Sequence, residues 1–225
     1  VDHLLNKSRR RTAPEMMQVF PDAWPAKLES LLGDELVQDA DDGPDAEDGP
    51  EAGGDRRSGD TSGARGVAGA GHVVVHTRVN FRFDPERFRE REHRLRRPDL
   101  QVVRTSEEMF ERIDGKVIPK YYWKNARHFH DDGVGFTLVC DGEPISTAFS
   151  SFRHDDKLEL GIETLEAHRG NGHAQCVCAR LIDYCLERGF EPVWSCRLGN
   201  KGSYELALRL GFEPTITRPY YEVGA

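Results

Sequence analysis

Two glycines stand between a strand-like segment and a helical one, in the hexapeptide RGNGHA at residues 169–174. The apolar run LELGIET precedes them, and apolar residues at helical spacing follow from Ala174 to Leu186. A turn of this kind leaves the first N–H groups of the helix without internal partners and gives that end a partial positive charge. Gly170 and Gly172 carry no Cβ, so an anion can approach the backbone closely. Taken alone, these residues indicate either a diphosphate site or a tight structural turn.

The glycine spacing excludes two common phosphate-binding motifs. A P-loop continues with Gly-Lys and then Ser or Thr, and no such run follows Gly172. A dinucleotide fingerprint opens a βαβ unit, whereas the segment before Arg169 has the pattern of antiparallel strands.

The cysteines and histidines are not spaced as metal ligands. Cys176 and Cys178 lie two apart within the predicted helix, where their side chains point to different faces, so we interpret them as small buried residues. His128 and His130 are placed in the same way on another predicted helix. Five cysteines without a recognisable secretory signal indicate reduced thiols. We therefore expect no metal and a cytoplasmic protein.

The formal net charge of -8 is concentrated in one tract. Residues 39–55 hold eight acidic and no basic residues, so subtracting -8 from -8 leaves the rest of the chain neutral. Residues 39–71 contain little that could be buried, which predicts a disordered linker. No apolar run approaches the roughly 20 residues of a membrane span. The one arginine-dense helix is interleaved with glutamates, so we expect neither a membrane nor a nucleic acid as a partner.

Alternating elements must position the glycine turn. Residues 1–38 predict a short helical segment around WPAKLESLL, and residues 72–225 predict the main domain after the linker. Asp84 is the predicted N-cap of the helix that follows the first strand, and the pair Thr105 and Glu108 has the form of a capping box. In chain order the domain has a strand at 72–83, a helix after 84, a helix after 105 and a helix at 119–130. Strands GFTLVC, PISTAFSSF and KLELGIET follow, joined by predicted hairpin turns at Asp141-Gly142 and at residues 154–156. The long helix, with Gly189 as its predicted C-cap, is followed by strand PVWSC, a short helix and a strand in EPTITRPYYEV. The expected fold class is α/β of the α+β type, with a mixed, mostly antiparallel central sheet flanked by helices.

The hexapeptide also matches the Arg/Gln-x-x-Gly-x-Gly/Ala signature of the GNAT superfamily of acetyltransferases, which the order of elements resembles as well. Further on, GNKGSYELALRLGF resembles the family's Asn-bearing loop, short helix and Leu-Gly-Phe ending. A closer resemblance, covering roughly residues 73–223, is to the subgroup of zwittermicin resistance acetyltransferases. It rests on FHDDGVGFTLV, PISTAFSSF, LGIETLEAHRGNGHA and CLERGFEPVWSC.

The resemblance implies acetyl-CoA as co-substrate. Its pantetheine arm would lie along the backbone of Ile162, Glu163 and Thr164, and Asn200 would contact the same arm. The strands LELGIET and PVWSC would splay apart to admit the thioester. The pyrophosphate would be held by Arg169, Gly170, Asn171, Gly172, His173, Ala174 and Gln175.

The implied chemistry is direct attack by an amine on the thioester, which needs a base for the ammonium proton and an acid for the leaving thiolate. Glu163 and Glu159 lie on the strand beside the cofactor, and we prefer Glu163 as base because it is nearer the loop. The alternative for Glu163 is a solvent-facing strand carboxylate. The tyrosine that often serves as acid in the family falls at Ala207 here, so Tyr204 is the candidate acid, with Ser203 as another substitute.

The predicted function is acetyl transfer from acetyl-CoA to a primary amine of a small molecule. Two alternatives are a non-catalytic acyl-CoA-binding module and a protein or peptide N-acetyltransferase. A homodimer is left open as the assembly. Candidate acceptor contacts on the early helices are Tyr121, Trp123, Lys124 and His128.

Overall fold

The computed structural model describes residues 15–18, 22–39 and 72–224. The linker expected at 39–71 therefore lies outside the described residues from residue 40 onwards. The chain forms two compact units. The first unit comprises Val1–Val79, Cys196–Lys201 and Ile216–Ala225, and the second comprises Asn80–Ser195 and Gly202–Thr215.

The second unit is built on an antiparallel meander, with strand order β7-β6-β5-β4. The strands are β4 (Val102–Arg104), β5 (Gly135–Cys140), β6 (Glu143–His154) and β7 (Lys157–Thr164). The predicted hairpin turns are confirmed, because Asp141, Gly142 and Asp155 have φ values of 51°, 81° and 50°. Strand β4 had no clear pattern in the sequence. The mostly antiparallel strands flanked by helices confirm the predicted fold class.

Strand β8 (Glu191–Arg197) runs parallel to β7 but pairs with it only briefly. Among the described residues the ladder consists of Lys157 with Glu191, Leu158 with Pro192 and Glu159 with Val193. Strand β7 then continues for five more residues. The two strands thus separate after Glu159, as expected for a sheet that splays open beside the glycine turn.

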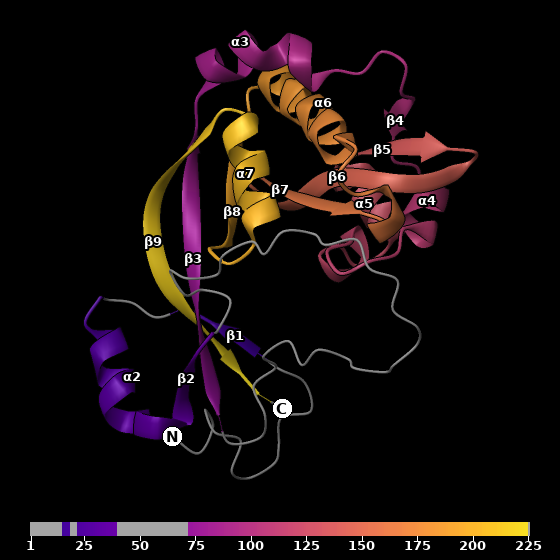
Figure 1. Ribbon diagram of the computed structural model, residues 1–225. Helices are drawn as coiled ribbons and strands as arrows, with labels where there is room; N and C mark the ends of the chain where they lie inside the picture. The colour runs from indigo at the N-terminus through magenta and orange to yellow at the C-terminus, as the bar shows by residue number, and fades with distance from the viewer. Residues whose placement is uncertain (1–14, 19–21, 40–71, 225) are drawn as a thin grey trace, which may run out of the picture. The chain divides into compact units, whose positions relative to one another are not determined.

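Helix α6 (His173–Arg188) packs against β5, β6 and β7 and carries the long apolar stripe predicted for it (Figure 1). It ends at Gly189, whose left-handed φ of 75° and N–H bond to Leu186 O make the predicted C-cap. Helix α3 (Pro85–Leu95) begins where predicted, since the Asp84 side chain accepts from the N–H groups of Glu86 and Arg87. Helix α7 (Lys201–Arg209) precedes β9 (Phe212–Val223).

The predicted capping box at Thr105 is wrong by one residue. Helix α4 (Glu107–Arg112) is capped by Ser106, whose Oγ accepts from Met109 N–H at 3.1 Å. Thr105 is instead buried, with its Oγ1 at 2.9 Å from Thr137 Oγ1. The Thr105 hydroxyl is hydrogen-bonded in the interior, so the hydroxyl of the next residue, Ser106, caps the helix.

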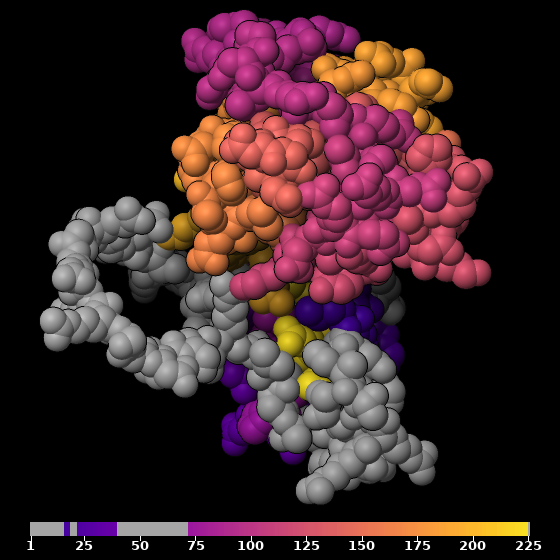
Figure 2. Space-filling view, turned by 90° about the vertical axis from the view of Figure 1, so that its right-hand side faces the viewer, coloured from indigo at the N-terminus to yellow at the C-terminus, as the bar shows by residue number. Residues whose placement is uncertain are grey.

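The single helix predicted at residues 119–130 is also wrong, because the segment breaks in two. A 3₁₀ turn, η3 (Pro119–Tyr121), is followed by helix α5 (Ala126–Asp132). The break lies at Asn125, whose side chain accepts from His128 N–H at 2.8 Å and so starts a new helix. Figure 2 shows magenta, pink and orange residues of the second unit together on the visible surface.

The first unit contains β1 (Glu15–Met17), α2 (Trp24–Leu32), the turn η1 (Gly33–Glu35), β2 (Leu36–Gln38) and parts of β3 (Val73–Phe83) and β9. Strand β1 pairs antiparallel with β9, and β2 pairs parallel with β3. The predicted amphipathic helix is confirmed, with Leu28 and Leu32 buried, although Leu31 is 54% exposed. The hydrophobic core of the first unit consists of Leu28, Leu32, Val73, Val75, Tyr221 and Val223.

A buried polar cluster joins four segments of the first unit. His76 is fully buried, with Nδ1 at 2.5 Å from Asp39 Oδ2 and Nε2 at 2.9 Å from Glu222 Oε2. Arg197 Nη2 donates to the same Glu222 oxygen at 3.3 Å, and its Nε donates to the Tyr220 hydroxyl at 2.6 Å. Burial of the polar groups in this cluster is tolerated because each has a hydrogen-bond or ion-pair partner beside it.

Candidate active site

The glycine turn has the backbone geometry of an anion cradle. Gly170 and Gly172 adopt left-handed φ values of 78° and 76°, and a Cβ added at either position would project into open space. Gly172 is the N-cap residue of α6, with no side-chain cap bond and no acidic residue in the first turn. The N–H groups at this end therefore lack the side-chain acceptor that closes α3, α4 and α5.

Side chains around the glycine turn form hydrogen bonds that support its backbone. Asn171 Nδ2 donates to Arg169 O at 3.1 Å and closes the turn on itself. Gln175 Nε2 donates to Arg94 O at 2.7 Å, which directs that side chain toward α3. The Nδ1 atom of His173 is buried without a hydrogen-bond partner among the described residues, a condition that a bound polar group would relieve. The backbone of the turn thus fits a diphosphate.

Arg169 turns toward β7 and away from the glycines. Its Nε donates to Thr164 O at 3.0 Å, and Nη2 lies 3.2 Å from Glu163 Oε1. The side chain is half exposed. The arginine therefore ties the start of the glycine turn to the end of the strand before it.

Glu163 is 9% exposed and receives four hydrogen bonds. Its Oε2 accepts from the N–H groups of Lys116 and Val117 at 2.7 and 2.8 Å. Its Oε1 accepts from Arg169 and, at 3.2 Å, from Thr164 N–H. The alternative of a solvent-facing strand carboxylate is therefore wrong. Glu163 instead attaches the loop that joins α4 to η3 to the end of β7.

Gly115 makes that attachment close. Its φ is 142°, and a Cβ there would lie 2.5 Å from Glu163 Cγ, far inside van der Waals contact. Only a residue without a side chain lets the loop backbone rest on the carboxylate. The dipeptide Asp114-Gly115 is a turn signal in the sequence, but it does not show what the turn packs against.

Glu159 occupies the point where β7 and β8 separate. Its Oε1 accepts from Ser195 Oγ at 2.7 Å, so the side chains bridge the two strands just past their last ladder pair. On the other side Glu159 is paired with Phe152 of β6, and Ser151 Oγ donates to Glu159 O at 3.1 Å. The bridge to Ser195 has no signature in the sequence.

The remaining predicted residues lie on or just before α7. Tyr204 is partly buried, and its ring meets that of Phe81 edge-on with centroids 5.2 Å apart. Ala207 is fully buried, so its position faces the interior. Asn200 belongs to the first unit, and its contact with a cofactor stays a prediction.

A pocket of about 550 Å³ lies beside Phe152 in the second unit. Trp123 and His128, two of the predicted acceptor contacts, line it, whereas Tyr121 and Lys124 are exposed elsewhere. The full lining is Tyr122, Trp123, His128, Asp132, Ser151, Phe152, Arg153, His154 and Asp155.

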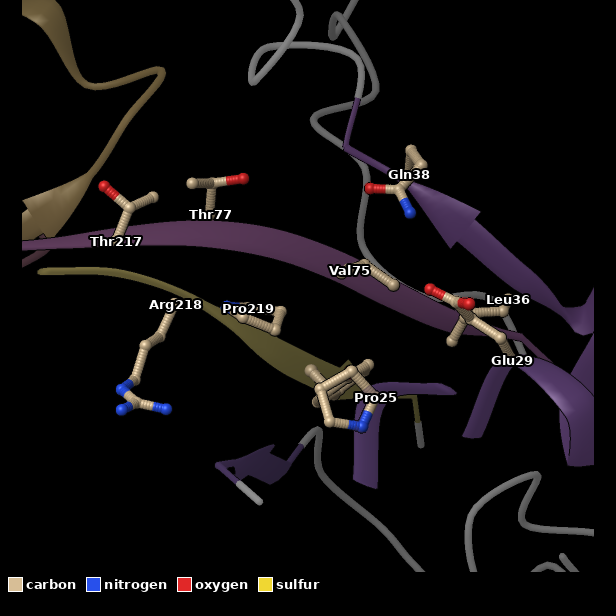
Figure 3. A pocket seen from close by; sticks show the side chains of 10 residues that line it. Pro25, Glu29, Leu36, Gln38, Val75, Thr77, Thr217, Arg218 and Pro219 are labelled. Carbon is tan, nitrogen blue, oxygen red and sulfur yellow. The ribbon is translucent and has the colours of Figure 1, made fainter. Parts of the chain in front are cut away.

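Another pocket, of about 260 Å³, lies within the first unit between β2, β3, β9 and α2 (Figure 3). Thr77 and Thr217 lie at one end of the view and Gln38, Leu36 and Glu29 at the other. None of the predicted catalytic or cofactor-binding residues lines either pocket. The anion cradle is therefore an open turn on the surface.

A family model described as GNAT acetyltransferase matches residues 70–221, which is most of the chain. The chain belongs to the GNAT acetyltransferase family. The match contains the glycine turn, both strand carboxylates and helix α7. The narrower resemblance to zwittermicin resistance acetyltransferases stays a prediction.

One similar protein was found by sequence comparison and another by structure comparison. An uncharacterized N-acetyltransferase of Bacillus subtilis strain 168, YdfB, is 36% identical over 103 residues, which are 46% of this chain and 40% of YdfB. The chain thus matches less than half the length of that relative. The crystal structure of a GCN5-related N-acetyltransferase-like protein from Streptococcus suis 89/1591 has a TM-score of 0.64 at 20% identity. The alignment covers 99% of this chain and 75% of that one, and it shows a shared fold.

No helix in the described part of the chain combines the length and apolar character needed to cross a membrane.

Proposed function

We propose that this member of the GNAT family transfers the acetyl group of acetyl-CoA to a primary amine of a small molecule by direct attack. The observation that carries the proposal is the glycine turn, where two left-handed glycines border open space at an uncapped helix start. Such a turn binds a diphosphate through backbone N–H groups and the helix dipole.

The residues for the cofactor follow from this placement. The pyrophosphate would be held by the backbone of residues 170–175, and the pantetheine arm would lie along Ile162 to Thr164. Beyond Glu159 the described ladder shows no pairing of β7 with β8, which leaves that edge of β7 for the amides of the arm. When bound, acetyl-CoA supplies the thioester that the amine attacks.

The proton chemistry has candidates on β7 and α7. Glu163, the base preferred from the sequence, would have to act while its oxygens accept hydrogen bonds from residues 116, 117, 164 and 169. Glu159 is the other carboxylate of the strand. Tyr204 stays the proposed acid for the thiolate, and Tyr204→Phe should lower turnover while leaving CoA affinity nearly unchanged.

Acetyl-CoA binding and turnover are tested separately. Calorimetry should show binding that Gly172→Asp abolishes, because its carboxylate would occupy the place of the pyrophosphate. Gly142→Asp is the matched control, since Gly142 also has a left-handed φ, of 81°, and open space but lies in the β5–β6 turn. If both variants bind like the wild type, the glycine turn is not the cofactor site. Thiol release with a panel of amines then reports catalysis.

One observation favours the non-catalytic alternative. Ala207 stands where the family often has its acidic tyrosine, and it is fully buried. Acetyl-CoA binding without thiol release on any amine would support an acyl-CoA-binding module. Release with peptide amines alone would support the protein or peptide N-acetyltransferase.

A further inference from the structure

The pocket beside Phe152 lies at the end of β7 that is opposite to the glycine turn. Its hairpin residues, 151–155, come before β7, whereas the glycine turn follows that strand. A strand of eight residues separates its two ends by about 25 Å. At about 550 Å³ the pocket lies within the size range of small-molecule sites. It is therefore a candidate site apart from the cofactor turn.

Three aromatic side chains line the pocket from two segments of the chain. Tyr122 and Trp123 lie between η3 and α5, and Phe152 lies on β6. Phe152 is 59% exposed and Tyr122 is 49% exposed, which is unusual for large apolar groups that lie together. Trp123 is held in place by its Nε1, which donates to Ser150 O at 2.6 Å. Exposed aromatic faces attract cations, because the face of the ring carries the negative part of its quadrupole.

The charges that line the pocket also favour a cation. Asp132 and Asp155 contribute two negative charges and Arg153 one positive charge, a sum of -1 with the lining histidines neutral. Arg153 Nη1 donates to Asp132 O at 3.1 Å, and the guanidinium lies over the ring of Phe190 at 4.6 Å from its centroid. Phe190 does not line the pocket, so this positive charge is directed away from it.

The carboxylates of the pocket are solvated rather than enclosed. The side chains of Asp132 and Asp155 are 69% and 81% exposed. A primary ammonium has three N–H groups and loses hydrogen bonds to water wherever it meets an aromatic face. A nitrogen that carries alkyl groups has fewer N–H groups to satisfy, and the alkyl groups gain contact with the rings. The lining thus favours an alkylated ammonium over a primary one.

We propose that this pocket binds a small cation whose nitrogen carries alkyl groups, with a quaternary ammonium as the limiting case. The aromatic faces contact the alkyl groups, and the two carboxylates supply the negative charge. A quaternary nitrogen has no proton that an acetyl group could replace, so this ligand is not the amine of the proposed function. The inference goes beyond that function and does not rest on it.

Binding is tested with three ligands of similar size, using the full chain. Choline carries a quaternary ammonium, 3,3-dimethylbutan-1-ol has a carbon in place of that nitrogen, and ethanolamine carries a primary ammonium. Saturation-transfer NMR on the methyl protons measures the first two, and competition with choline measures ethanolamine. Choline should bind about tenfold more tightly than either of the others. Equal binding of choline and the neutral alcohol, equal binding of choline and ethanolamine, or no choline binding would overturn the proposal.

Matched variants test whether the ligand lies in the pocket. Phe152→Leu keeps an apolar side chain but removes the ring, and it should weaken choline binding about fivefold. Tyr121→Leu is the control, because Tyr121 is 69% exposed but does not line the pocket, and it should leave binding unchanged. The double change Asp132→Asn with Asp155→Asn should weaken binding about threefold at low salt. Equal effects of Phe152→Leu and Tyr121→Leu would place the cation elsewhere and overturn the assignment.

The cofactor-site variant tests whether the two sites are separate. Gly172→Asp, which is expected to abolish acetyl-CoA binding, should leave the affinity for choline unchanged. Choline binding by a chain that does not bind acetyl-CoA would support the pocket while the proposed function fails. A loss of choline affinity in Gly172→Asp as large as that in Phe152→Leu would overturn the separation of the two sites.

Discussion

Each of the two units buries a glutamate whose carboxylate accepts hydrogen bonds, but the donors differ in kind. Glu222 in the first unit faces basic side chains, His76 and Arg197, and the cluster ties together residues from distant parts of the sequence. Glu163 in the second unit faces mostly backbone N–H groups, and only Arg169 among its partners is charged.

The difference separates stability from site geometry. A buried carboxylate that pairs with basic side chains from other strands mainly holds those strands together, and losing it leaves these side chains with one partner fewer. A buried carboxylate that accepts from loop N–H groups fixes an irregular backbone, here residues 115–117 beside the cofactor turn. We therefore expect changes at Glu222 to act on unfolding and changes at Glu163 to act on the site as well.

The largest effect is expected at Glu222. Glu222→Ala should lower the free energy of unfolding by about 3 kcal/mol, because it leaves His76 and Arg197 with only Asp39 of the two carboxylates that they share. Urea denaturation measures the loss. Glu205→Ala, which breaks an exposed pair with Arg209, is the control and should change stability by less than about 0.5 kcal/mol. Equal effects of the two changes would show that the buried cluster contributes nothing beyond a surface pair.

Removal of the Glu163 side chain comes next. Glu163→Ala leaves the N–H groups of residues 116 and 117 without their acceptor, which should cost about 2 kcal/mol of unfolding free energy. Unlike Glu222→Ala, it should also reduce turnover measured well below the melting temperature. Glu166→Ala, three residues away and exposed, should do neither. A stability loss with wild-type turnover would make Glu163 equivalent to Glu222.

The same contact can be broken from the loop side. Gly115→Ala places a Cβ against Glu163 and should cost about 2 kcal/mol, whereas Gly142→Ala should cost about 1 kcal/mol because it meets open space and pays only for its left-handed φ. In a Glu163→Ala background the cost at Gly115 should fall by the part that comes from the clash, while the strain of its φ of 142° remains. A double-mutant cycle by denaturation measures this coupling. Additive effects would place the clash somewhere other than Glu163.

Sequence patterns predicted the regular elements well because they reflect burial. The apolar stripe of α6, the cap at Asp84 and the hairpin at Asp141 and Gly142 all depend on neighbours close in sequence. The break at Asn125 shows the limit, since a cap residue outweighed an apolar spacing that continued across it. The glycine turn could be predicted because it too depends on residues that are close in sequence.

The tertiary partners of the site could not be predicted in this way. Glu163 meets residues 116 and 117, which lie 47 and 46 positions away, and Glu159 meets Ser195 36 positions away. Nothing in the strand LELGIET distinguishes a carboxylate that holds a loop from one that bridges to the neighbouring strand. The alternation of residues along β7 indicates that Glu159 and Glu163 share a face of the strand. Their hydrogen-bond partners become apparent only from the tertiary structure.

The smallest effect is expected at Arg169, and it sharpens the comparison with Arg197. Arg169 is half exposed and its pair with Glu163 spans 3.2 Å, so Arg169→Ala should cost less than about 1 kcal/mol of stability. Because the guanidinium is directed to Thr164 O and Glu163, acetyl-CoA affinity measured by calorimetry should fall less than about threefold. Arg169→Lys serves as control, since it keeps the charge but loses the fork. A tenfold loss in the alanine variant that the lysine variant restores would mean that the arginine leaves Glu163 for the pyrophosphate, and Glu163 would then be held by backbone N–H groups alone.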